Sequence, residues 1–79
     1  MPRYARRAGR DLDGLPEVLR VKAKNLCERL DAEPALGKKL KGPLEGLRSV
    51  RLGRSHRIIY AIDAAGVIVM TVVARKDAY

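Results

Sequence analysis

The chain has few of the residues that usually stabilise a small domain. Its 79 residues include no Trp, no Phe and a single cysteine, Cys27. One cysteine cannot form an internal disulfide, and no Cys/His cluster has the spacing of a zinc site. The core must therefore come from Leu, Val, Ile, Ala and a few Tyr. We expect marginal stability, which a bound partner would raise.

Long apolar segments are also missing. The longest apolar run, Val67 to Ala74, is far too short to span a bilayer, and the basic stretch at 1–7 is not followed by the apolar region of a signal peptide. These features predict a cytoplasmic protein without a membrane span, and the lack of a disulfide fits a reducing compartment. The length predicts one domain over residues 1–79.

Positive charge is the most pronounced feature of the composition. Lys and Arg number 17 against 9 Asp and Glu, which gives a net charge of +8. A small body with this surplus attracts polyanions, so nucleic acid, an acidic protein and an anionic membrane surface are candidate partners. Arginine outnumbers lysine and favours bidentate phosphate contacts, which puts nucleic acid first. The alternative is a basic surface that only keeps the protein soluble.

The first half of the chain predicts two helices. Residues 8–15 indicate one or two helical turns after a short polar strand at 3–7. Pro16 then starts an amphipathic helix of about 15 residues that ends near Asp31. Its apolar stripe consists of Leu19, Ala23, Leu26 and Leu30. Cys27 lies beside this stripe, so we interpret it as a buried hydrophobe and not as a nucleophile.

The second half changes to strand periodicity. A cationic loop is expected at 37–46, followed by strands at 48–52, 56–62 and 67–73. The last strand is β-branched almost throughout, and we expect it to be the central strand, covered on both faces. Short connections make the strands antiparallel neighbours. The pattern predicts an α+β domain with helices on one sheet face and the other face left for function.

Alternation along 56–62 separates two candidate site residues. Arg57 and His56 must point to opposite faces, and an unpaired arginine is costly to bury, so Arg57 is expected on the helix-free face. One face and its rim would then carry Lys38, Lys39, Lys41, Arg48, Arg51, Arg54, Arg57 and Arg75. This set predicts phosphate binding, and the alternative is a solvated charged face.

Catalysis also needs groups that transfer protons. The candidates are Tyr60, Tyr79, His56 and a lysine or arginine with a lowered pKa among like charges. Tyr60 is expected in the core, and a lone histidine such as His56 is more often structural than a base. Tyr79 is the best placed of the tyrosines because it follows Arg75 at the end of the chain.

Four short segments, spread over the chain from residue 40 to residue 79, follow one another in an order and spacing that match a known family. They are Leu40-Lys41-Gly42, Arg51-Leu52-Gly53, His56-Arg57-Ile58-Ile59-Tyr60 and Arg75-Lys76-Asp77-Ala78-Tyr79. In this order and spacing the chain resembles the RelE/ParE toxin superfamily. The resemblance implies a RelE-like fold, with two N-terminal helices packed on one face of a small, mainly antiparallel β-sheet.

For the ribonuclease branch, the resemblance implies cleavage of mRNA in the ribosomal A site by attack of a ribose 2′-OH on the adjacent phosphate, with no metal or cofactor. Arg57 and Arg75 would stabilise the phosphate in the transition state, with Arg48 or Arg51 as the basic strand group and Tyr79 as the C-terminal tyrosine. RNA contacts are expected from Lys38, Lys39, Lys41, Arg54, His56 and Lys76. The expected partners are an acidic antitoxin in a hetero-oligomer, mRNA and the ribosome with its 16S rRNA, but no membrane.

The chain departs from the family pattern at two positions. Many relatives carry His where this chain has Ala74, and the YoeB-like branch ends in His-Tyr where this chain has Ala78-Tyr79. Lys, Arg and Tyr would then carry the reaction, or His56 would substitute, or activity would be weak. Two other hypotheses stay open: a ParE-like inhibitor of DNA gyrase without nuclease activity, and a silent module that only binds an antitoxin.

Overall fold

Two helices and a five-stranded sheet make up the computed structural model, which describes residues 2–74. The helices are α1 (Arg6–Asp13) and α2 (Glu17–Ala32), with short 3-10 helices η1 (Pro34–Leu36) and η2 (Gly42–Leu44). The strands are β1 (Arg3–Tyr4), β2 (Lys38–Lys39), β3 (Leu47–Leu52), β4 (His56–Asp63) and β5 (Gly66–Ala74). Their order is β1-β5-β4-β3-β2, antiparallel except for the β1–β5 pair. The predicted α+β fold class is confirmed.

Both helices follow from local sequence signals. α2 begins directly after Pro16 and ends at Ala32, within one residue of the predicted start at Pro16 and end near Asp31. α1 begins and ends two residues earlier than the predicted 8–15. Between residues 2 and 74 neither helix is long and apolar enough to cross a membrane.

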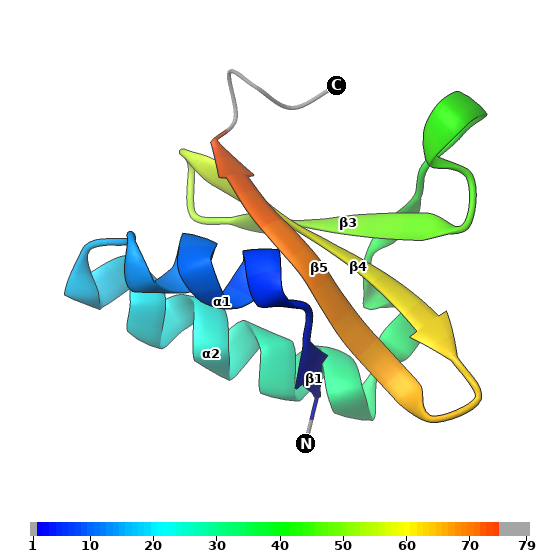
Figure 1. Cartoon of the computed structure of the whole chain (residues 1–79), viewed down its shortest axis with the longest axis horizontal. Coiled ribbons are helices and arrows are strands. Elements are labelled where there is room, and N and C mark those ends of the chain that lie inside the picture. Colours follow the sequence, from blue (N-terminus) through cyan, green and yellow to red (C-terminus); the bar gives the residue numbers. More distant parts are fainter. Residues whose placement is uncertain (1, 75–79) are drawn as a thin grey trace.

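The core lies between the two helices and one face of the sheet. Figure 1 shows α1 and α2 lying side by side, with β5 crossing close to them. The buried cluster comprises Ala8, Leu12, Ala23, Cys27 and Leu30 from the helices, and Leu52, Ile58, Tyr60, Val67, Val69 and Val72 from the sheet. Tyr60 is fully buried, so its predicted core position is confirmed. The helices thus cover the face that carries Ile58 and Tyr60.

The prediction that the last strand is central was wrong. β4 is the central strand, while β5 lies next to the two-residue edge strand β1. Part of the remaining β5 edge is covered by α1, because the Asp11 carboxylate accepts hydrogen bonds from Thr71 Oγ1 and from the Val72 amide, the latter at 3.0 Å. An apolar, β-branched run looks the same in sequence whether a strand or a helix lies beside it.

The segment predicted as a loop at 37–46 contains a short edge strand. β2 pairs with β3 through the register Lys38 with Ser49 and Lys39 with Arg48. Two consecutive lysines show no alternation of apolar and polar residues, so periodicity could not detect this strand. Its presence matters because it fixes the face on which each lysine lies.

Candidate phosphate-binding site

Arg51 and Arg57 lie directly opposite one another on neighbouring strands. Arg51 of β3 is the register partner of Arg57 of β4, so both side chains leave the same face of the sheet. This face is opposite to the one that carries Ile58 and Tyr60, and Arg57 therefore lies on the helix-free face, as predicted. Like charges that face one another across two strands destabilise a sheet, so the pair favours an anion between them.

Lys38 joins the two arginines on this face. Its register partner Ser49 is two residues from Arg51 on β3, so Lys38, Ser49 and Arg51 share one side of the sheet. A surface cavity of about 440 Å³ is lined by Leu36, Gly37, Lys38, Ser49, Val50, Arg51 and Arg57. We call it the Arg57 cavity. Of the residues between 2 and 74, three basic residues and no carboxylate line it.

The Arg57 guanidinium includes a donor without an acceptor among residues 2–74. Its Nε is buried and has no hydrogen-bond partner in this part of the chain. A buried N–H without an acceptor costs about 1–3 kcal/mol. A phosphate oxygen in the cavity would accept this hydrogen bond and would lie between positive charges, so the cavity is suited to a phosphate.

A smaller hollow adjoins the Arg57 cavity at the β3–β4 turn. It measures about 70 Å³ and is lined by Arg51, Gly53, Arg54, His56 and Arg57. The His56 side chain leaves the opposite face from Arg57, as predicted, and its Nδ1 lies 2.7 Å from Ser55 Oγ. His56 nevertheless lines the same hollow as Arg51 and Arg57, because it stands at the start of β4 beside the turn that carries Arg54.

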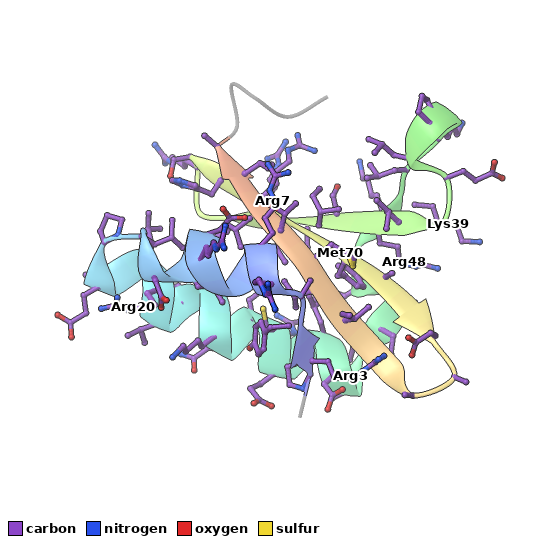
Figure 2. All side chains as sticks on the ribbon, in the orientation of Figure 1. Arg3, Arg7, Arg20, Lys39, Arg48 and Met70 are labelled. Carbon is purple, nitrogen blue, oxygen red and sulfur yellow. The ribbon has the colours of Figure 1, made fainter. Side chains whose placement is uncertain are left out.

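The predicted basic surface is divided between two faces. Arg48 and Lys39 are register partners, and they share the face of Tyr60, opposite to Arg51 and Arg57. They lie side by side near the start of β3 (Figure 2). With Leu40, Lys41, Gly42, Glu45, Gly46 and Leu47 they line a separate hollow of about 530 Å³. The expectation that one face and its rim carry all the basic residues was therefore wrong for Lys39 and Arg48, because odd spacing along a strand reverses the face.

A set of hydrogen bonds around Gly37 fixes one wall of the Arg57 cavity. The Tyr60 hydroxyl donates to the Pro34 carbonyl at 2.6 Å and accepts from the Gly37 amide at 2.8 Å. Arg48 Nη1 donates to the Gly37 carbonyl at 2.9 Å. We call Tyr60, Arg48 and their bonds to Pro34 and Gly37 the Gly37 clamp. The clamp holds the chain that enters β2 against β3.

Glycine is required at position 37 by close packing. A Cβ atom there would lie 2.6 Å from the Tyr60 hydroxyl and 2.7 Å from the Ser49 carbonyl oxygen. Sequence reasoning placed Tyr60 in the core but missed the clamp. The available signal was that a buried tyrosine hydroxyl needs a hydrogen-bond partner, although nothing in the sequence named that partner.

Three predicted site residues, Arg75, Lys76 and Tyr79, lie outside the described residues. β5 ends at Ala74, whose register partner is His56, and Val73 pairs with Arg57. The strand that leads to Arg75 therefore ends next to the strand that carries Arg57.

The comparisons with known proteins decide the family. A family model described as the ParE toxin of the type II toxin–antitoxin system parDE matches residues 3–79. The chain belongs to the ParE toxin family. It is therefore the toxin component of a type II toxin–antitoxin system, within the wider RelE/ParE superfamily.

Solved structures of related toxins share the fold of this ParE-family toxin. A chain of the RelBE2 toxin–antitoxin complex from Mycobacterium tuberculosis is 32% identical, with a TM-score of 0.84 over 95% of this chain and 96% of that one. A YoeB/ParE toxin from Agrobacterium tumefaciens is 19% identical, with a TM-score of 0.82 over 94% and 96%. The isolated RelE toxin of Escherichia coli is 18% identical, with a TM-score of 0.78 over 99% and 86%. No curated protein matches the sequence.

Cys27 of this ParE-family toxin is a core residue, as predicted. Burial raises the pKa of its thiol, and the hydrogen bond with Tyr4 only partly offsets that effect. Partial desolvation of its side chain, followed by the neighbouring Cys27, raises the pKa of Tyr4 to about 12. A nucleophilic cysteine needs a lowered pKa and exposure, so Cys27 does not supply a nucleophile. Within residues 2–74 no group of three or more His, Cys, Asp or Glu side chains is arranged to hold a metal ion.

Proposed function

We propose that this toxin is a ribosome-dependent endoribonuclease that cleaves mRNA in the A site. The single observation that carries the proposal is the Arg57 cavity, where a buried Arg57 Nε, without an acceptor among the described residues, lies beside Arg51 and Lys38. Such a site can hold one phosphate of a polynucleotide. Two guanidinium groups that face one another do not stabilise the sheet, so a bound anion explains their position better than a role in folding.

The proposed reaction is attack of a ribose 2′-OH on the adjacent phosphorus. The phosphorus passes through a dianionic five-coordinate state, and guanidinium groups already in place around it stabilise the extra charge more than they stabilise the substrate. We assign this role to Arg57 and Arg51. Arg51 is preferred over Arg48 as the basic strand group, since Arg48 lies on the other face and donates to Gly37.

Two further roles remain proposals from the family resemblance. Arg75 would contact the same phosphate, and Tyr79 would act at the C-terminal end of the site. Both follow Ala74, which stands where many relatives carry histidine. Lys41, Lys39, Arg54 and Lys76 would contact RNA around the site, and the first two would do so from the other side of the β2–β3 hairpin.

We also propose the partners that accompany this activity. Several of the similar structures are toxin–antitoxin complexes, and a net charge of +8 suits an acidic antitoxin that covers Arg51 and Arg57. The 16S rRNA of the ribosome would provide further phosphates for the exposed basic side chains. This activity would take place in the cytoplasm.

Primer extension on mRNA in a purified translation mixture tests the proposal. The wild-type toxin should produce new 5′ ends only when ribosomes are present. Arg57→Ala should reduce the rate of cleavage by about 10²–10³-fold, as removal of one preorganised charge-stabilising donor does elsewhere. Intact message with the folded wild-type protein would overturn the proposal.

A matched variant controls for the loss of positive charge. Lys24 is exposed on α2, a helix that covers the sheet face opposite to Arg57, and Lys24→Ala removes the same single charge. Cleavage should stay close to the wild-type rate. An equal loss in Lys24→Ala and Arg57→Ala would show that total charge, and not the cavity, carries the activity.

Gyrase inhibition is the second candidate function, and the match to the ParE family model favours it. A gyrase inhibitor would not need the Arg57 cavity. Under this alternative, the toxin would inhibit supercoiling by purified gyrase, leave ribosome-bound message intact, and keep its toxicity in Arg57→Ala cells. Inhibited supercoiling together with uncut message would replace the ribonuclease proposal.

A further inference from the structure

We propose that Lys38 is the group that protonates the leaving 5′-oxygen when RNA is cleaved in the Arg57 cavity. This inference rests on the proposed ribonuclease function and adds a catalytic residue to it. A proton donor must reach the phosphate, must hold a proton that it can release, and must be fixed in place. Lys38 meets these three requirements.

The sheet register places Lys38 within reach of the phosphate. Lys38 pairs with Ser49, and Arg51 is the diagonal neighbour of Lys38 on the same face. Diagonal neighbours across two strands lie roughly 7–8 Å apart, which long side chains bridge easily. The Lys38 ammonium and the two guanidinium groups therefore line one cavity. The adjacent Lys39 leaves the other face.

Among the described residues that line the cavity, Lys38 is the best suited to release a proton. The others are Leu36, Gly37, Ser49, Val50, Arg51 and Arg57. Arginine stays protonated in proteins, and a serine hydroxyl is a weak acid. An ammonium group is a stronger acid than a sugar hydroxyl. Lys38 can therefore protonate the leaving 5′-oxygen, which would leave only slowly as an unprotonated alkoxide.

The Gly37 clamp holds Lys38 in this position. Tyr60 and Arg48 fix the Pro34 carbonyl and both backbone polar groups of Gly37, the residue directly before Lys38. The Lys38 side chain is exposed, but its backbone is thus fastened to the core and paired with β3. Precise placement of a proton donor requires such support.

The proposed step balances as follows. The 2′-oxygen forms a bond to phosphorus and gives its proton to water, while the bond from phosphorus to the 5′-oxygen breaks. The leaving 5′-oxygen takes a proton from the Lys38 ammonium, and neutral Lys38 then regains a proton from water. The products are a 2′,3′-cyclic phosphate and a 5′-hydroxyl, and no metal or redox partner is consumed.

A sulfur substitution in the substrate tests the role of Lys38. In mRNA with sulfur in place of the bridging 5′-oxygen at the cleaved position, the leaving thiolate needs no proton. Lys38→Met should slow cleavage of ordinary mRNA by about 10²-fold or more, the usual contribution of general acid catalysis. The same variant should cleave the sulfur substrate at close to the wild-type rate. An equal loss on both substrates would assign Lys38 to binding alone and overturn the inference.

Two further variants keep the result specific. Lys39→Met should show the wild-type ratio of sulfur to oxygen rates, because Lys39 lies on the opposite face. Rescue by sulfur in Arg75→Met instead of Lys38→Met would give the role to Arg75 and refute the inference. Wild-type toxin that cuts neither substrate would refute the ribonuclease function itself, whereas wild-type cleavage without rescue in Lys38→Met would refute only the role of Lys38.

Discussion

The two faces of β3 use the same kind of side chain in different ways. Arg51 is exposed and lies opposite Arg57 in a cavity that no carboxylate of the described part of the chain lines. Arg48, three residues earlier, is half-buried and donates to the Gly37 carbonyl at 2.9 Å. One arginine is available to a ligand, and the other stabilises the wall beside that ligand. The face of a strand, and not the amount of charge, therefore separates the exposed arginine from the one that supports the fold.

The strongest way to break this division is to disturb the clamp at Gly37. Gly37→Ala places a Cβ 2.6 Å from the Tyr60 hydroxyl and 2.7 Å from the Ser49 carbonyl oxygen. We expect the free energy of unfolding to fall by about 3 kcal/mol, the upper end of the usual cost of overpacking. Urea denaturation measures the change.

Gly9→Ala is the matched control for Gly37→Ala. Gly9 is inside α1, and nothing lies within 4 Å of a Cβ added there. Alanine should raise the free energy of unfolding by about 0.5–1 kcal/mol, because it is the better helix former. Equal destabilisation by both substitutions would contradict the packing account of Gly37.

Removing the Tyr60 hydroxyl from the helix-covered face should have the next largest effect on the free energy of unfolding. Tyr60→Phe keeps the ring but leaves the Pro34 carbonyl and the buried Gly37 amide without their partner. We expect a loss of about 1–3 kcal/mol in the free energy of unfolding. Amide hydrogen exchange should also become faster at Gly37, and unchanged exchange there would show that Tyr60 does not hold the segment.

The paired variants Arg48→Met and Arg51→Met test the comparison itself. Arg48→Met removes a hydrogen bond to a carbonyl and should lower the free energy of unfolding by about 1–2 kcal/mol. Arg51→Met removes an exposed side chain and should leave stability within about 0.5 kcal/mol. RNA binding, measured by salt-dependent fluorescence anisotropy with the folded variants, should weaken more in Arg51→Met. The opposite order would reverse the two roles.

The smallest effect concerns Cys27 on the helix-covered side. Burial raises the pKa of its thiol, so less thiolate is present at a given pH than for a free cysteine. The folded toxin should therefore react slowly with a thiol reagent at pH 8, and denaturant should restore the rate of an ordinary cysteine. Rapid labelling of the native protein would show that the core opens on that side.

Much of the fold follows from periodicity and turn residues. The long helix from Glu17, the strands around 47–52, 56–63 and 66–74, and the burial of Cys27 and Tyr60 were all predictable, because each rests on a local pattern of apolar residues. β2 was not predictable, since two lysines carry no pattern. The central position of β4 was missed because strand order depends on contacts between distant segments.

The sequence by itself determined the fold class, the positive charge and the position of Arg57 on the helix-free face, since alternation along a strand and the cost of burying an unpaired charge are local effects. Only the tertiary structure decided which basic residues lie together. The register of β2 and β3 brought Lys38 to Arg51 and Arg57 and sent Lys39 and Arg48 to the opposite face. Register is set by pairing between segments remote in the chain, so a single sequence does not reveal it.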